Sequence, residues 1–149
     1  MNVEKIKPPM YLLVAIIVVI ALNFLLPIMV VIPTSWVFLG ILPLIVGLAI
    51  NIRADRAFHL AGTAVCPFEA SSALVTDGPY RWSRNPMYLG FILVLIGVSV
   101  FLGSLTPYVI VLAFAFLMDR LFIRMEEQKM SAQFGLAWEA YKSQTRRWL

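Results

Sequence analysis

The sequence predicts an all-helical integral membrane protein with about four transmembrane helices, and three observations support this fold class. Hydrophobic residues make up 61% of the 149 residues, and the mean hydropathy is +0.87. Charged residues make up only 13%, whereas about a quarter is usual in soluble domains. The apolar residues are gathered in four runs rather than spread along the chain. At this length a single domain, 1–149, is expected.

The four apolar runs are candidate membrane spans at residues 9–31, 36–52, 87–103 and 106–123. A helix needs roughly 17 to 25 residues to cross a bilayer, so the first run is ample and the other three are near the lower limit. Proline has no backbone N–H group to donate, so helices are expected to kink or end at Pro27, Pro33 and Pro43.

The positions of the charged residues predict the topology. All 12 Lys and Arg residues lie before the first run, between the second and third, or from position 120 onward. The short connections at 32–35 and 104–105 contain none. Cytoplasmic loops of membrane proteins are enriched in Lys and Arg. Both termini and the long connection at 53–85 are therefore expected on the cytoplasmic side.

Two segments outside the runs are expected to shape a site on this side. The connection at 53–85 is too long for a turn and too apolar for disorder, so it is expected to pack at the membrane interface. The tail, 126–149, is amphipathic and carries a helical stripe of Met130, Phe134, Trp138 and Tyr141. Gly135 is a candidate bend. This tail either lies on the lipid headgroups or folds over the mouth of the bundle and closes a site, and the two arrangements are compatible.

The stretch RWSRNPMYLG, residues 81–90, stands at the start of the third run. Asn85 is a favoured N-cap residue and Pro86 suits the first helical position, so a helix is expected to begin there. The free N–H groups of its first turn, together with the two arginines of the stretch, would form an anion-binding corner. Gly90 would allow close approach to the helix backbone. An ordinary helix start with snorkelling arginines is the alternative interpretation.

A second group of charged residues stands at the end of the fourth run and consists of Asp119, Arg120, Arg124, Glu126 and Glu127. On an unbroken α-helix, Arg120, Arg124 and Glu127 would share one face, and Asp119 and Glu126 the adjoining face. The helix would then direct acids and bases towards the same mouth of the bundle. Ion pairs on a solvated helix end are the plainer interpretation.

Together the two groups describe the chemistry of a ligand. The corner at 81–90 favours an anion, and the carboxylates at 126–127 favour an ammonium group. Tyr80, Trp82 and Tyr88 offer flat faces to an aromatic ring or a sulfonium cation. A zwitterion that carries an aromatic base fits this description, but the residues alone do not name it.

Three motifs carry a resemblance to a known family: the run LVTDGPYRWSRNPMYLG, the later Glu126–Glu127 pair, and the ending FGLAWEAYKSQTRRWL. Together they resemble the isoprenylcysteine carboxyl methyltransferase family. More broadly, they are similar to the integral-membrane methyltransferases that include phospholipid N-methyltransferases. The resemblance covers residues 59–149, and the combination of motifs is more specific than any one of them.

The resemblance implies S-adenosylmethionine as the cofactor, bound within about 78–149 by a multi-pass protein of the cytoplasmic membrane whose active site faces the cytoplasm. It implies that the cofactor pocket is lined by Tyr80, Arg81, Arg84, Asn85, Pro86, Tyr88, Leu89, Gly90, Glu126, Glu127 and Tyr141. The methyl acceptor, a lipophilic small molecule or a prenylated group, would enter from the bilayer. Neither a metal nor a nucleic acid is among the implied partners.

Three positions depart from the family's pattern. Asn85 stands where eukaryotic members have His, so a mechanism that needs an imidazole base there is excluded. Cys66-Pro67 stands where Asn-Pro is frequent, and Cys66 is expected to fill a small apolar site. Trp138 replaces a frequent Tyr, which preserves packing and loses a hydroxyl.

The resemblance also bears on the acceptor. A carboxylate acceptor is already ionised, so its methylation needs positioning and desolvation but no general base. Arg120 and Arg124 are the candidate catalytic residues that would bind this carboxylate. An amine or thiol would have to lose a proton, and His59 is the only histidine. The sequence therefore favours the carboxylate of a prenylcysteine-like or isoprenoid acceptor, with a phospholipid amine or a thiol as the alternative.

Two functions of other classes stay open, a small membrane transporter and a membrane scaffold. Transporters usually carry an ionisable residue within their spans, whereas no charged residue occurs in the four runs before Asp119. A scaffold could pack its helices through Gly40, Gly47, Gly90 and Gly97, but it has no need for a clustered polar mouth.

Overall fold

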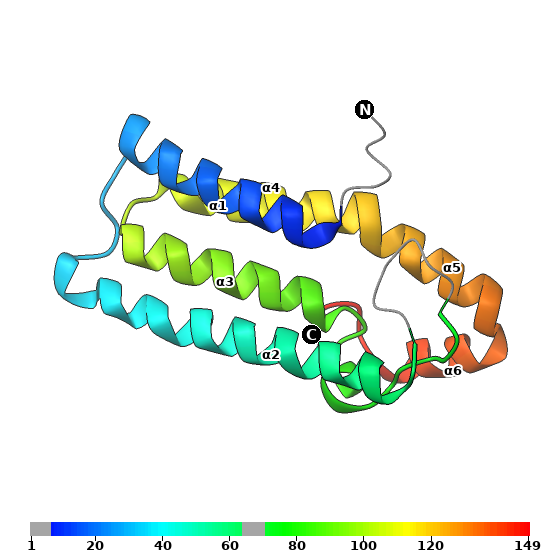
Figure 1. Cartoon of the computed structure of the whole chain (residues 1–149). Helices are drawn as coiled ribbons and strands as arrows, with labels where there is room; N and C mark the ends of the chain where they lie inside the picture. Colours follow the sequence, from blue (N-terminus) through cyan, green and yellow to red (C-terminus); the bar gives the residue numbers. More distant parts are fainter. Residues whose placement is uncertain (1–6, 64–70) are drawn as a thin grey trace.

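A computed structural model describes residues 7–63 and 71–149 (Figure 1). In chain order the elements are α1 (Pro8–Leu25), the 3₁₀ segment η2 (Thr34–Gly40), α2 (Ile41–Leu60), the 3₁₀ turn η3 (Gly78–Arg81), α3 (Pro86–Leu102), α4 (Thr106–Met118), the π-helical turn η4 (Asp119–Ile123), α5 (Arg124–Phe134) and α6 (Leu136–Gln144). Within the described ranges the regular structure is helical, apart from one isolated bridge between Val30 and Ser104. The predicted all-helical fold class is confirmed.

Three helical stretches are long and apolar enough to cross a membrane, namely Pro8–Leu25, Thr34–Leu60 and Thr106–Phe134. The fourth apolar helix, α3, is shorter. The arrangement is that of a small integral membrane protein. In the longest stretch, the 18 residues 106–123 contain only two charged side chains, Asp119 and Arg120. The more highly charged α5 therefore lies beyond the spanning part.

Two helix boundaries differ most from the predicted runs. Helix α1 ends at Leu25 rather than at 31, because Pro27 lacks the N–H group that would continue it. Helix α2 continues beyond 52 to Leu60, since its charged residues extend the helix past the end of the apolar run. The connection predicted at 53–85 is correspondingly shorter.

At one end of the bundle, the two short connections are joined by hydrogen bonds. The backbone N–H groups of Val31 and Ile32 donate to the carbonyl of Gly103 at 2.9 and 3.0 Å. The hydroxyl of Thr106 donates to the carbonyl of Leu26 at 2.6 Å. Unpaired backbone groups are costly in a bilayer, so these bonds stabilise the non-helical segment after α1.

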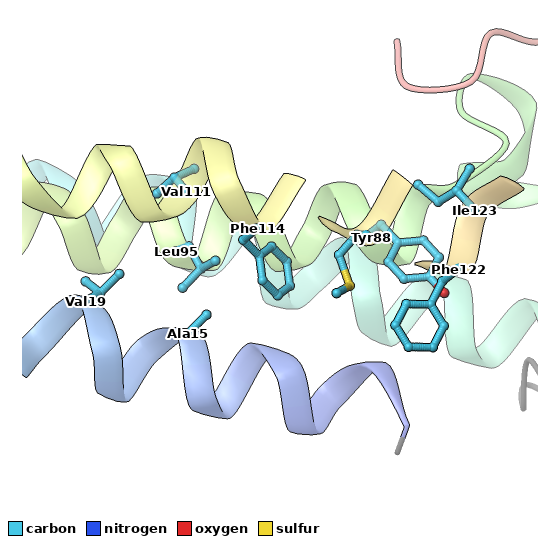
Figure 2. Packing of buried hydrophobic residues seen from close by; sticks show 9 residues of the cluster. Ala15, Val19, Tyr88, Leu95, Val111, Phe114, Phe122 and Ile123 are labelled. Atoms are coloured by element: carbon cyan, nitrogen blue, oxygen red, sulfur yellow. The ribbon is translucent and has the colours of Figure 1, made fainter. Parts of the chain in front are cut away.

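Helix α3 lies at the centre of the bundle, between α2 and the α1–α4 pair (Figure 1). On the α1–α4 side, Leu95 is fully buried and packs with Val19 and Val111 (Figure 2). On the α2 side the helices meet through glycines, and a Cβ atom on Gly90 would lie 2.8 Å from the carbonyl oxygen of Gly47. The close approach at Gly90 is therefore made by a neighbouring helix.

The opposite end of the bundle gathers segments that are far apart in the sequence. The start of α1, the end of α2, the start of α3, helices α5 and α6 and the C-terminus all lie there (Figure 1). Gly135 has a φ of 50°, a backbone conformation that favours glycine, and it separates α5 from α6. The predicted bend is confirmed, and it turns α6 back towards the start of α3 (Figure 1).

Candidate functional site

A cavity of about 730 Å³ lies at this end of the bundle. This volume falls within the range of roughly 300–1,000 Å³ that is usual for cofactor and ligand pockets. The lining comes from the starts of α1 and α3, the end of α2, residues 71–75, η3, α5 and α6. Of the predicted cofactor-binding residues, the cavity is lined by Tyr80, Arg84, Asn85, Pro86, Tyr88, Glu126, Glu127 and Tyr141.

The start of α3 is where the sequence predicts it, with Pro86 as the first helical residue and Asn85 at the N-cap position. The side chain of Asn85, however, makes no capping hydrogen bond. Its amide nitrogen donates instead to the carbonyl of Arg147 at 3.1 Å. The expected role as a capping side chain is therefore wrong, because the amide is oriented so that its nitrogen reaches the C-terminal segment and its oxygen does not accept from the first-turn N–H groups.

The guanidinium of Arg84 is already engaged by the protein's own acceptors. Its Nε and Nη2 atoms lie 3.0 and 2.9 Å from Oε1 of Glu127. Its Nη1 donates to the carbonyls of Thr145 at 2.6 Å and Lys142 at 3.3 Å. The side chains of Arg84 and Glu127 are only 9% and 12% exposed. The corner predicted to bind an anion is thus occupied largely by a carboxylate and carbonyls of the same chain.

Glu126 is the carboxyl group of the cavity that has capacity left for a ligand. Its Oε1 accepts a hydrogen bond from the hydroxyl of Tyr88 at 2.7 Å, and among the described residues this is its hydrogen-bond partner. Burial raises the pKa of Glu126 from 4.5 to about 7, although the Tyr88 hydrogen bond and the charge of Lys129 both lower it. Near neutral pH the group therefore exists in both ionic forms.

Three buried aromatic residues form a wall of the cavity. Tyr80 comes from η3, and Trp138 and Tyr141 come from α6. The hydroxyl of Tyr141 donates to the carbonyl of Tyr80 at 2.7 Å, and the rings of Trp138 and Tyr141 are 5.7 Å apart. Burial raises the pKa of Tyr141 to about 12 and that of Tyr80 well above its usual value, so both phenols are neutral at physiological pH.

The two candidate catalytic arginines do not line the cavity. The turn η4 is π-helical, so the helix is not the unbroken α-helix on which their shared face with Glu127 was predicted. Arg124 pairs with Asp119, five residues earlier, at 2.9 Å. The guanidinium of Arg120 lies 4.9 Å from the ring centre of Phe116. A role for either arginine in binding an acceptor carboxylate stays a prediction.

Three predicted cofactor-binding residues also lie outside the cavity lining. Arg81 is exposed and pairs with Asp77 at 3.0 Å, whereas Gly90 faces α2 and Leu89 is absent from the lining. Their roles as cofactor ligands likewise stay predictions. Cys66 and Pro67 lie outside the described residues, so the expectation for Cys66 is not tested.

Several lining residues were not singled out by the sequence. Lys7, Pro8 and Pro9 come from the start of α1, which looked like a plain apolar span. Gln133 lies three residues after Met130 on α5, and this helical spacing from the predicted stripe was the available signal. Its side-chain amide donates to the carbonyl of Ser71, joining α5 to the segment before η3.

Comparison with known protein families places the chain. A family model described as phospholipid methyltransferase matches residues 35–137, which is more than half of the chain. The matched region contains the stretch 81–90 and the Glu126–Glu127 pair. None of the curated proteins matches this chain. The resemblance seen in the sequence is confirmed at the level of this family, which includes the isoprenylcysteine carboxyl methyltransferase-like proteins. The chain therefore belongs to the phospholipid methyltransferase family and is a membrane methyltransferase.

Proposed function

We propose that this protein transfers a methyl group from S-adenosylmethionine to a polar group of a lipophilic acceptor taken from the bilayer. The observation that carries the proposal is the cavity itself, where the Glu126–Tyr88 pair and the aromatic wall meet at the end of a membrane bundle. The volume of the cavity and the chemistry of its lining fit a zwitterionic nucleoside cofactor.

In this proposal the lining residues bind and orient the cofactor. The carboxylate of Glu126 attracts a cationic group of the cofactor, and the hydroxyl of Tyr88 fixes the orientation of that carboxylate. Tyr80, Trp138 and Tyr141 offer aromatic faces to the adenine ring and to the sulfonium. When bound, the cofactor supplies an electrophilic methyl group. Exclusion of water by the buried wall strengthens each electrostatic contact.

The proposed orientation follows from charge. All Lys and Arg residues belong to the segments expected on the cytoplasmic side. The cavity is among them, because Arg84 and Lys129 line it and Arg147 pairs with Glu127 of its lining. The water-soluble cofactor would then enter from the cytoplasm. Apolar lining from Pro9, Met87 and Phe91 supports entry of the acceptor from the membrane side.

Two acceptor classes fit this cavity. The carboxylate of a prenylcysteine-like or isoprenoid acceptor, favoured by the sequence, would need no base but would need a cation beside it. The amine of a phospholipid would need to lose a proton before attack. The lining carries groups suited to each class: the carboxyl group of Glu126, with a pKa of about 7, suits the deprotonation of an amine, and Lys7 and Lys129 suit the binding of a carboxylate.

The test is methyl transfer by the purified protein in lipid vesicles, with a methyl-labelled cofactor. Parallel reactions contain phosphatidylethanolamine, an S-prenylated cysteine derivative, or neither. Label in one lipid product supports the proposal and identifies the acceptor class. Folded protein that labels neither acceptor, and labels no component of a total lipid extract, would contradict it and favour a scaffold.

A further inference from the structure

The second glutamate of the Glu126–Glu127 pair is held in a triad of ionic contacts. One oxygen of Glu127 pairs with Arg84 at 2.9 Å, and the other pairs with Arg147 at 2.6 Å. Arg147 also reaches Asp119 of η4 at 3.3 Å. Both oxygens of Glu127 are therefore used within the protein, in contrast to those of Glu126.

The triad secures the segment that follows α6, here called the C-terminal strap (residues 145–147). The backbone N–H of Arg84 donates to the carbonyl of Arg146 at 2.9 Å. The side chains of Ser83 and Asn85 donate to the carbonyl of Arg147 at 3.4 and 3.1 Å. The next residue, Trp148, packs against the apolar core of the bundle. The strap thus lies across the start of α3.

The position of the strap determines the position of α6. The strap directly follows α6, which carries Trp138 and Tyr141 of the cavity wall. Near the cavity, α6 is otherwise held by the hydrogen bond from Tyr141 to the carbonyl of Tyr80 at 2.7 Å, and by that from Arg84, a member of the triad, to the carbonyl of Lys142 at 3.3 Å. Release of the strap would free the C-terminal end of α6 and loosen the wall.

We infer that Arg84, Glu127 and Arg147 are positioning residues that close the cofactor cavity by clamping the C-terminal strap, and that Glu126 alone of the glutamate pair contacts the ligand. The inference rests on the proposed function. The side chain of Arg147 is 37% exposed and does not line the cavity. Arg147 would therefore support cofactor binding without contacting the cofactor.

The test compares two adjacent arginines. Arg147→Ala breaks the triad, whereas Arg146→Ala removes an exposed side chain of the same type one residue earlier. We expect Arg147→Ala to raise the KM for the cofactor about tenfold, which is the effect expected from losing one hydrogen bond between charged groups. The kcat at saturating cofactor should be nearly unchanged. Arg147→Lys should restore most of the affinity, and Arg146→Ala should resemble the wild type.

A double-mutant cycle separates clamping from direct contact. If Glu127 acts through Arg147, the variant carrying both Glu127→Gln and Arg147→Ala binds the cofactor about as well as the weaker single variant. If Glu127 contacts the cofactor directly, the two effects add, and the inference fails. A role in folding alone would lower the melting temperature of Arg147→Ala and leave its KM at wild-type level, which would also overturn it.

The wild-type protein distinguishes failure of this inference from failure of the proposed function. If the wild type binds no S-adenosylmethionine, the proposed function and the inference fail together. If the wild type binds the cofactor and Arg147→Ala binds it equally well, the inference that Arg147 holds the C-terminal strap in place for cofactor binding is wrong. The proposed function would then stand.

Discussion

The hydroxyl of Tyr88 donates a 2.7 Å hydrogen bond to Glu126, which joins the first turn of α3 to the first turn of α5. Tyr88 also belongs to the buried cluster of the bundle, where its ring stacks on Phe122 (Figure 2). The apolar core thus fixes the position of Tyr88, whereas Glu126 faces the cavity. Packing within the membrane bundle is thereby coupled to the orientation of a carboxyl group in the site.

The ionisation of Glu126 predicts a pH-dependent affinity for the cofactor. With a pKa of about 7, the ionised fraction of Glu126 rises from about 10% at pH 6 to about 90% at pH 8. Because a cationic ligand prefers the carboxylate, binding should strengthen about fivefold to tenfold over this interval. Calorimetric titrations at both pH values measure it. Glu126→Gln should bind weakly and equally at the two, and equal pH dependence in both proteins would contradict the assignment.

The same ionisation predicts an opposite trend in stability. The pKa of Glu126 is higher in the folded protein than its ordinary value of 4.5, so the folded state binds the proton more tightly than the unfolded state. The contribution of this group to stability is therefore complete below pH 4.5 and is lost as the pH rises towards 7. Melting temperatures of the wild type and Glu126→Gln should converge at low pH and diverge above pH 7, with the variant then the more stable.

Removal of the Tyr88 hydroxyl should shift the pH profile of activity. The hydrogen bond stabilises the ionised form of Glu126, so Tyr88→Phe is expected to raise the pKa of that carboxyl group and to displace the activity profile to higher pH. The measurement is kcat/KM for the cofactor between pH 6 and 9. Tyr108→Phe, at the opposite end of the bundle, is the control and should leave the profile in place.

Loss of the Tyr141 hydroxyl should destabilise the cavity wall. This hydroxyl donates a buried 2.7 Å hydrogen bond to the carbonyl of Tyr80. Tyr141→Phe leaves that carbonyl without its donor, at an expected cost of about 1–3 kcal/mol. Unfolding in a denaturing detergent measures the loss, and the KM for the cofactor should rise with it. A stability and KM both equal to those of the wild type would show that α6 is held by other contacts.

Substitution of Gly90 should impair helix packing rather than ligand binding. A Cβ atom there would lie 2.2 Å from the amide nitrogen of Asn51 and 2.8 Å from the carbonyl oxygen of Gly47. Gly90→Ala must therefore push α3 away from α2, at about 1–3 kcal/mol. Ala49→Leu, at an exposed position of α2, is the control and should unfold like the wild type. A cofactor affinity that falls while stability is unchanged would instead favour ligand contact at Gly90.

The fold class was predictable from the sequence because lipid imposes long apolar helices whatever their packing. The ends of the helices were harder to predict. Hydropathy does not distinguish the apolar but non-helical segment after Leu25 from a helix, and it ends the second run before the charged last turns of α2. The π-helical turn η4 left no recognisable pattern, and it interrupts the unbroken α-helix on which Arg120 and Arg124 were predicted to share a face with Glu127.

The candidate site was partly predictable because its residues are locally clustered in two stretches, around Arg84 and around Glu126. The local sequence pattern could not reveal which contacts these two stretches make with each other. The anion-binding corner predicted at Arg84 is filled by Glu127 and by carbonyls some 60 residues away. The C-terminal Arg147 looked like an ordinary basic residue, and only the fold brings it to Glu127.

The most direct test of the central claim is calorimetric titration of S-adenosylmethionine into the detergent-purified protein at pH 8. We expect one site per chain, with an affinity in the usual micromolar to millimolar range for enzyme substrates, about 1 µM to 1 mM. Binding should be lost in Glu126→Ala and retained in Arg56→Ala, which removes an exposed arginine at the end of α2. Folded wild-type protein that releases no heat of binding and retains no cofactor in equilibrium dialysis would show that this cavity is not a site for S-adenosylmethionine.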